Sequence, residues 1–445
     1  MKDEPGDRGS RAGETVVLLV SGLLSLLPYL VYRGLFARLY WFGDEFDLID
    51  QIDRMGFWRW VWLVFAENFV PLFKVLWGGS VLVFGGSYAV MIALVWLTHA
   101  LNVGLLGRLM RTCGLSWSAV FLAQILFGLT SANYETLAWS VQGSAVLSVT
   151  FLLLAMDAFF RARPAWRTVG WVASSALSFS RGVLTGPVVA LGVMLNRGEG
   201  PRGSLAARAR TVGLLILPSV VVAALIGVLA SGNHQHMKGH GAEAAVYGLW
   251  YYCANPAHYL LSVESYGWHT VAALGLLKVS LVLWALARGT GRVRVLFAML
   301  VAFEMGNAAL LGIGRYHTGI LTTLASRYQY ASLLGIAPMV GFWFSRMCGR
   351  VPGGVSAGRA IAAVVLVALG VTMVRGWGPE LEPFTAWRGT ESRRILLVDP
   401  DPKPDAVPGI PGLRMDRAKG LIEKYHLHSG RFGGISFDGV NQKSS

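Results

Sequence analysis

Long apolar segments follow one another along most of this chain, and they limit it to folds that a membrane can hold. The first runs from about residue 14 to 41, and the others lie near 76–104, 115–130, 138–160, 168–195, 211–231, 270–287, 295–313, 328–345 and 360–375. A helix that crosses a bilayer needs about 20 mostly apolar residues. Since 54% of the residues are hydrophobic and only 14% are charged, we predict an all-α polytopic membrane protein.

Basic residues set the orientation that we predict. Lys2, Arg8 and Arg11 precede the first segment, which places the N-terminus in the cytoplasm. Arginines flank the segment 168–195 on both sides, so it has to enter the membrane and return as two short helices that turn near Ser180–Gly182. The count is then about eleven transmembrane segments, two of them short, and the C-terminus lies outside the cytoplasm. The loops predicted to face the cytoplasm carry Arg108, Arg111, Arg161, Arg163, Arg167, Arg197, Arg202, Arg208, Arg210, Arg288, Arg292, Arg294, Arg346, Arg350 and Arg359.

The net charge has the same origin. The chain has 39 Lys and Arg against 25 Asp and Glu, which gives +14. In a soluble protein this excess would suggest a nucleic-acid partner. Here the positive charges lie in the predicted cytoplasmic loops, as the positive-inside rule requires. We therefore expect no nucleic-acid partner and predict a multi-pass protein of the inner (cytoplasmic) membrane. Separately, high Arg and Gly usage with few Lys suggests a bacterium with a GC-rich genome.

The chain divides into two parts. Residues 1–375 form the predicted transmembrane bundle, with a first outer loop at 38–75, and residues 376–445 form a small extracytoplasmic C-terminal tail. The tail is rich in proline and charge, and it is too small for a domain of the usual size. Within it, residues 411–428 have apolar side chains at helical spacing, which predicts one surface helix.

The first outer loop carries the strongest functional signal. A helix that starts near Asp44 places carboxylates along one arc and apolar residues along the other, and only Phe46 breaks the pattern. This pattern predicts an amphipathic helix at the membrane surface, followed by an aromatic interfacial run from Phe57 to Phe65. The carboxylates are Asp44, Asp47, Asp50 and Asp53, and the apolar residues are Leu48, Ile49, Ile52 and Met55.

Two carboxylates stand where the chain leaves the first segment. A carboxylate at a membrane boundary is partly desolvated, which raises its pKa and improves it as a base. We therefore interpret Asp44 and Glu45 as candidate catalytic residues, and Asp47 as a candidate substrate ligand on the same arc. For Asp50 and Asp53 a solvated acidic face is the simpler interpretation.

The order of these features resembles the GT-C superfamily of integral membrane glycosyltransferases, which includes protein O-mannosyltransferases and the lipid A aminoarabinose transferase. In that group an Asp-Glu pair follows the first transmembrane helix, and two interfacial helices, a Pro-Leu element with a nearby Lys and the second span come next. This chain has Asp44-Glu45, Pro71-Leu72 and Lys74 in that order. It departs from the group because Lys74 follows the proline instead of preceding it.

The resemblance implies a fold and a function. It implies a GT-C-like bundle that moves a sugar from a polyprenyl-phosphate donor to a glycan, lipid or protein acceptor on the extracytoplasmic face, usually with inversion. Asp44 would be the base, Glu45 its support or an acceptor ligand, and Lys74 a ligand of the donor phosphate. A base removes the proton of the acceptor hydroxyl, and cations stabilise the charge on the leaving phosphate.

Arginines on the predicted outer side are the exceptions to the charge rule. Arg315 and Arg327 lie in the segment 314–330 between two spans, and their position favours binding of the donor phosphate. Arg327-Tyr328 also resembles the Arg-Tyr element in a late outer loop of many GT-C enzymes, which implies a substrate contact for Tyr328. Arg181 lies at the turn of the re-entrant pair, where it would either bind a lipid phosphate or acid or extend to the membrane surface.

Three further features are less specific: Glu135, a loop with three histidines, and Glu304. Glu135 opens the fourth segment and would either bind sugar hydroxyls or cap the helix. The loop with His234, His236 and His240 has spacing that allows a divalent cation, although a mobile polar loop is the simpler interpretation. We therefore predict no cofactor and leave a divalent cation open. Glu304, with an asparagine one turn later, predicts a buried hydrogen bond inside a helix.

Two other functions stay open. A transporter or flippase for a lipid-linked sugar places polar groups at the midplane, often on inverted repeats. In this chain the polar groups gather at the outer interface, and no repeat is evident. A polysaccharide polymerase or ligase also uses outer-loop arginines, but it has no need of an Asp-Glu pair after the first segment. A membrane glycosyltransferase is therefore the function that we predict.

Overall fold

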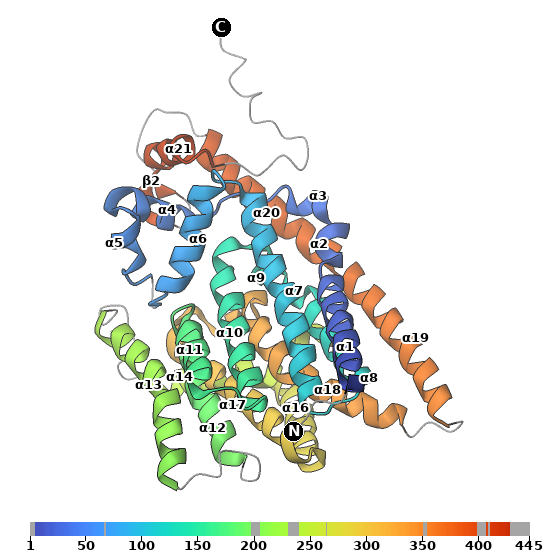
Figure 1. Ribbon diagram of the computed structural model, residues 1–445. Helices are drawn as coiled ribbons and strands as arrows, with labels where there is room; N and C mark the ends of the chain where they lie inside the picture. The colour runs from blue at the N-terminus through green and yellow to red at the C-terminus, as the bar shows by residue number, and fades with distance from the viewer. Residues whose placement is uncertain are drawn as a thin grey trace.

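The computed structural model is a bundle of helices with a layer of shorter helices at one end (Figure 1). It describes residues 5–65, 68–196, 205–229, 240–263, 265–349, 354–397, 406–407 and 410–427. Within these residues, eight helical segments are long and apolar enough to cross a membrane, and three shorter apolar helices accompany them. The chain is therefore an α-helical multi-pass membrane protein, as predicted.

The helices of the bundle alternate in direction, so that their connections gather at two ends (Figure 1). The bundle consists of α1 (Pro5–Leu24), α7 (Tyr88–Thr112), α8 (Trp117–Gly128), α10 (Gly143–Phe160), α11 (Ala165–Ala176), α12 (Thr185–Leu195), α13 (Leu205–Leu229), α16 (Trp268–Arg288), α17 (Gly291–Arg315), α18 (Gln329–Cys348) and α19 (Gly354–Arg375). The connections between α7 and α8, between α10 and α11 and between α16 and α17, which carry predicted cytoplasmic arginines, lie at the end opposite α4 (Asp44–Met55), which agrees with the predicted alternation (Figure 1). The side of the membrane that each end faces stays a prediction.

Small residues allow these helices to approach one another closely. A Cβ on Gly341 of α18 would lie 2.2 Å from the carbonyl oxygen of Ala119 on α8, and a Cβ on Gly312 of α17 would lie 2.2 Å from that of Ala244. Lipid drives helices together only weakly, so close backbone contact at small residues is what stabilises such pairs. These two contacts hold α8 to α18 and α17 to α14.

Shorter elements form the layer at the α4 end. The helix predicted near Asp44 is confirmed, because α4 begins at this residue. Acidic residues in its first turn stabilise the positive end of the helix dipole. The short elements are α2 (Leu27–Val31), α3 (Arg33–Phe36), α4 (Asp44–Met55), α5 (Phe57–Val61), α6 (Pro71–Val83), η1 (Ser131–Asn133), α9 (Tyr134–Ala138), η2 (Ser140–Gln142), η3 (Ser180–Leu184), α14 (Gly241–Ala254), α15 (Ala257–Leu260), η5 (Tyr316–Thr318), η6 (Ile320–Leu324) and η7 (Ser326–Tyr328).

The segment predicted at 76–104 is wrong as a single helix. The chain breaks between α6 and α7, where Gly85 and Gly86 have φ of +59° and +70°. A Cβ on Gly86 would also lie 2.5 Å from the carbonyl oxygen of Tyr425. Only glycine adopts this backbone conformation easily and leaves room for the C-terminal tail. The apolar run continues through the break, which is why hydropathy does not reveal it.

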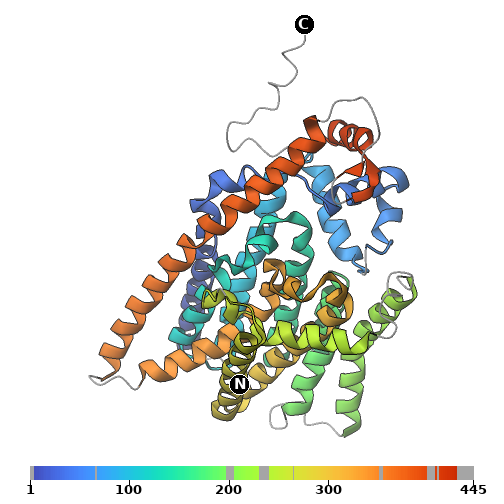
Figure 2. The same cartoon turned by 180° about the vertical axis from the view of Figure 1, so that it is seen from behind.

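The C-terminal tail returns across the α4 end. Helix α20 (Trp377–Leu397) continues nearly in line with α19 (Figure 2). Strands β1 (Ala406–Val407) and β2 (Ile410–Arg414) form a small antiparallel pair, and α21 (Met415–Lys424) follows them. Helix α21 lies within residues 411–428, so the predicted surface helix is confirmed. Helix α21 packs on α4, and this contact links the C-terminal tail to the first outer loop.

Candidate active site

A cavity of about 480 Å³, which we call the site cavity, lies where the first outer loop, the turn η3 and the connection between α17 and α18 meet. The fold therefore brings together residues that are far apart in the sequence. The predicted site residues that line the site cavity are Asp44, Arg181, Arg315, Arg327 and Tyr328.

Arg181 is held in the site cavity by a tight turn. The re-entrant pair predicted at 168–195 turns at η3, and a Cβ on Gly182 would lie only 1.9 Å from the carbonyl oxygen of Ser175. The Arg181 side chain is 5% exposed, and its Nε has no hydrogen-bond partner among the described residues. Its guanidinium lies over the Phe179 ring at 4.9 Å. Because an unpaired buried charge is costly, this arrangement favours an anion in the cavity.

The loop that carries Arg327 and Tyr328 is fixed on both sides. The backbone N–H of Arg327 donates to Glu135 Oε2 (3.1 Å), and the Glu135 N–H donates to Ser326 Oγ (3.2 Å). On the other side, the Tyr251 hydroxyl donates to the Tyr328 carbonyl oxygen (2.8 Å). Glu135 does not line the site cavity, so its carboxylate positions the loop.

A buried ion pair supports the same loop from inside the bundle. Lys278 Nζ donates to Glu304 Oε1 (2.5 Å) and to the carbonyl oxygen of Asn255 (2.6 Å). The Asn255 amide in turn donates to the carbonyl oxygen of Thr323 (2.9 Å) and accepts from Gln329 (2.8 Å). The buried hydrogen bond predicted for Glu304 is confirmed, but its donors are Lys278 and Ser332 on other helices, and the asparagine one turn later donates to a tyrosine hydroxyl. A lysine in the middle of an apolar segment was the signal for the true partner.

Asp44 opens onto the site cavity at the first turn of α4. The surrounding protein desolvates its carboxyl, and this burial raises the pKa of Asp44 above its usual range, although the nearby Arg315 and Arg327 guanidinium groups lower it in part. A carboxylate with a raised pKa accepts a proton more readily. Asp44 is therefore a candidate proton acceptor at the edge of the site cavity.

Part of the lining of the site cavity is apolar. This apolar wall is formed by α13 and α17, both long enough to cross a membrane. An apolar groove between such helices suits a hydrocarbon chain, and the arginines at its end suit the phosphate that terminates the chain. The apolar residues of this wall are Ala223, Ile226, Leu310, Leu311 and Ile313.

Glu45 is buried beside the site cavity and does not line it. Its carboxylate accepts hydrogen bonds from Ser140 Oγ (2.5 Å), the Tyr88 hydroxyl (3.1 Å) and the backbone N–H of Phe42 (2.9 Å). Arg388 Nη2 lies 3.3 Å from Glu45 Oε2. Burial raises the pKa of Glu45, and the Arg388 charge opposes that rise. This geometry fits a residue that anchors the start of α4.

Arg388 is the residue beside the site cavity that sequence reasoning missed. It is 1% exposed, and its Nη1 also donates to the carbonyl oxygen of Ala138 (3.0 Å). Its guanidinium lies 4.9 Å from the ring of Phe42, 5.6 Å from that of Phe384 and 5.8 Å from that of Trp139. The only signal in the sequence was one arginine among aromatic residues of the tail, which is too common a pattern to single out.

Two other predicted site residues do not line the site cavity. Lys74 is fully buried, and its Nζ donates to the carbonyl oxygens of Trp60 (3.0 Å) and Leu63 (2.9 Å). Asp47 accepts a hydrogen bond from Gln51 (2.7 Å), one turn later on α4. Lys74 thus ties α5 to α6, and Asp47 lies on the surface of α4 outside the cavity lining.

Asp50 and Asp53 bind the tail, so the interpretation as a solvated acidic face is wrong for both. Arg417 of α21 donates to Asp50 Oδ1 (2.6 Å) and Asp53 Oδ2 (2.5 Å), and Lys424 and Tyr425 also donate to Asp53. Burial alone would raise the pKa of Asp53, but the hydrogen bonds from Lys424 and Arg417 lower it to about 2.

Helix α4 is consequently covered on two sides. Phe46, which breaks the amphipathic pattern, is fully buried, whereas Met55 is 40% exposed. Leu48, Ile49 and Ile52 of the apolar arc are buried, and the tail binds Asp50 and Asp53 of the acidic arc. Amphipathic periodicity is interpreted as one buried and one solvent-exposed face, so it could not predict that the tail packs on the acidic side.

The predicted histidine loop lies mostly outside the described residues, which include His240 but not His234 or His236. His240 Nδ1 lies 3.3 Å from Glu243 Oε1, and its ring stacks on Tyr316. Within the part of the chain that the structure describes, no group of three or more His, Cys, Asp or Glu side chains could hold a metal ion.

Comparison with known proteins finds no protein-family model that matches this chain and no curated protein that is similar to it. The function therefore has to be argued from the site cavity itself.

Proposed function

We propose that this protein is a membrane glycosyltransferase that moves a sugar from a polyprenyl-phosphate donor to an acceptor hydroxyl. The observation that carries the proposal is Arg181, a buried guanidinium whose Nε lacks a partner among the described residues. It lines the same cavity as Arg315 and Arg327, at the end of an apolar wall. A lipid-linked phosphate satisfies both the positive charge and the apolar surface.

Asp44 completes the chemistry. It takes the proton of the acceptor hydroxyl, and the acceptor oxygen forms a bond to the anomeric carbon of the sugar. The bond between that carbon and the phosphate oxygen breaks at the same time, and polyprenyl phosphate leaves with the bonding electrons. Arg181, Arg315 and Arg327 stabilise the negative charge of the leaving group. Attack from the side opposite the phosphate inverts the anomeric centre.

The remaining site residues act through these four. Glu45 and Arg388 fix the start of α4 and thus the position of Asp44. Glu135 fixes the loop that presents Arg327 and Tyr328. In this proposal Lys74 has no contact with the donor phosphate, because its amine is bound to two carbonyl groups.

The test is transfer from a synthetic glycosyl polyprenyl phosphate by the purified full-length protein in detergent. We expect Asp44→Asn to reduce the rate by a factor of about 10²–10⁴, the usual contribution of a general base. Glu382→Gln is the matched control, because Glu382 is an exposed acid on α20 that does not line the site cavity. Full activity of Asp44→Asn would overturn the assignment of the base.

A transporter of lipid-linked sugars is the second candidate, because the Lys278–Glu304 pair is an ion pair buried inside the bundle, as is common in transporters. The two functions differ in their products. Movement of the lipid across liposomes without sugar transfer would favour transport, and release of free polyprenyl phosphate would favour the glycosyltransferase.

A further inference from the structure

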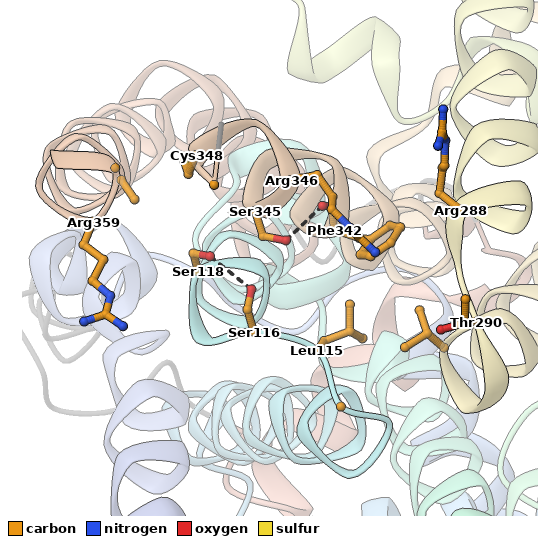
Figure 3. Close-up of a pocket in the computed structure, with 15 residues that line it drawn as sticks. Leu115, Ser116, Ser118, Arg288, Thr290, Phe342, Ser345, Arg346, Cys348 and Arg359 are labelled. Carbon is orange, nitrogen blue, oxygen red and sulfur yellow. Dashed lines mark hydrogen bonds between the residues drawn. The ribbon is translucent and has the colours of Figure 1, made fainter. Parts of the chain in front are cut away.

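A second cavity, of about 450 Å³, lies among helix ends at the end of the bundle opposite α4 (Figure 1), and we call it the basal cavity; Figure 3 shows the residues that line it. It lies where the connection between α7 and α8, the connection between α16 and α17, the end of α18 and the start of α19 come together. It shares no lining residue with the site cavity.

Three arginines from three different helices line the basal cavity. Arg288 is the last residue of α16, Arg346 lies in the last turn of α18, and Arg359 lies in the first part of α19. All three side chains are exposed, and among the described residues none of their guanidinium groups forms a hydrogen bond or an ion pair; that of Arg346 lies over the Phe342 ring at 5.2 Å. The basal cavity therefore carries uncompensated positive charge.

Some other arginines at this end of the bundle are paired with acids, whereas the side chains of the exposed Arg163, Arg167 and Arg210 form no hydrogen bond or ion pair among the described residues. Arg108 and Arg161 bind the two carboxylate oxygens of Asp157 at 2.8 and 2.9 Å, and Arg111 binds Glu14 at 2.9 Å. Pairing is thus available where the fold provides an acid. The basal cavity differs from the rest of this end because three separate helices bring Arg288, Arg346 and Arg359 to the lining of one cavity.

The rest of the lining combines hydroxyl groups with an apolar wall. Ser116 and Thr290 stand immediately before α8 and α17, and Thr290 makes no capping hydrogen bond with its side chain. Leu115, Phe342 and Ala362 supply apolar surface. A ligand that fits such a lining has an anionic oxygen-rich part and a hydrocarbon part.

We infer that the basal cavity binds the phosphate headgroup of an anionic membrane lipid. Helices α16 to α19 are long enough to span a membrane, so their ends lie at the level of the headgroups. Guanidinium groups bind phosphate oxygens in bidentate fashion, and basic pockets between membrane helices bind anionic lipid headgroups. A small soluble anion would leave the apolar wall uncovered, whereas an acyl chain covers it. This inference does not depend on the proposed glycosyl transfer.

The experiment is native mass spectrometry of the full-length protein titrated with phosphatidylglycerol or phosphatidylcholine. We expect tight binding of at least one phosphatidylglycerol. In a variant with Arg288→Gln, Arg346→Gln and Arg359→Gln, the affinity of the protein for phosphatidylglycerol should fall roughly a hundredfold. Each arginine contributes a factor of about ten or less to this loss. Phosphatidylcholine binding should not change.

A variant with the same loss of charge serves as the control. It carries Arg163→Gln, Arg167→Gln and Arg210→Gln, at exposed arginines that do not line the basal cavity. Equal loss of phosphatidylglycerol in the two variants would reduce the effect to general charge and overturn the inference. So would displacement of the lipid by millimolar glycerol phosphate, which would indicate a site for a soluble anion. Should the triple variant not fold, Arg359→Gln alone should still lose several-fold, and an unchanged affinity would contradict the site.

Discussion

Replacing Arg388 by methionine removes the guanidinium that pairs with the fully buried Glu45 carboxylate. Loss of one partner of a buried ion pair costs about 3–5 kcal/mol, because the other charge is left uncompensated. Glu45 keeps its hydrogen bonds from Ser140, Tyr88 and Phe42, so we expect the lower end of this range. A loss of about 3 kcal/mol corresponds to a roughly hundredfold change in the opening equilibrium of the region.

The loss should depend on pH. Burial raises the pKa of Glu45, and removal of Arg388 raises it further, since the cation lowers it. Below this raised pKa the carboxyl is neutral and the penalty disappears. The variant should therefore lose most stability at pH 8 and less near pH 5.

Hydrogen exchange of the α4 amides in the full-length protein measures this effect. Protection factors in α4 should fall roughly a hundredfold at pH 8 for Arg388→Met, and Arg388→Met combined with Glu45→Gln should recover a large part of the loss. Arg59→Met is the control, because Arg59 is exposed on neighbouring α5. The reasoning is refuted if the double variant is as unprotected as the single one, or if the single variant changes protection less than about threefold.

Three further predictions concern the charges around the site. Arg315→Gln should raise the pKa of Asp44 further, because the guanidinium lowers it, so the acid limb of the pH–rate profile should move to higher pH; a limb that stays in place contradicts this electrostatic role. Lys278→Met should destabilise the protein by about 3–5 kcal/mol in detergent unfolding, and addition of Glu304→Gln should restore part of it. Asp53→Asn should loosen α21 and speed limited proteolysis of residues 410–427. Because the pKa of Asp53 is lowered to about 2, acid should release the tail of the unsubstituted protein only between about pH 4 and 2.

Features that depend on neighbouring residues were predictable from the sequence. Helix α4 begins at Asp44, where the arc of carboxylates starts, and the re-entrant pair turns at Arg181, where flanking arginines require it. The long apolar helices also appear where hydropathy indicates them. In each case a local pattern and the membrane together leave one solution.

Features that depend on distant partners were not predictable. Glu45 follows Asp44 directly, and Lys74 follows the Pro71-Leu72 element, so the sequence suggested a role in the site for both. In the structure the Glu45 carboxylate binds the buried Arg388, and the Lys74 amine binds two backbone carbonyl groups. Burial of one side chain by another far along the chain leaves no periodic signal. Asp53 shows the same limit, since its partners lie in the tail.

Because the tail packs on α4, the contacts of α4 can be completed only late in the synthesis of the chain. Arg388 follows Glu45 by 343 residues, and chains grow at about 5–20 residues per second, so Glu45 is made about 20–70 s before the cation that pairs with it. During that interval the first outer loop has neither its buried ion pair nor the helix α21 that covers its acidic arc. The start of α4 can therefore reach its final position only after most of the bundle has been inserted, and a chain released before Arg388 lacks the contacts that fix Asp44.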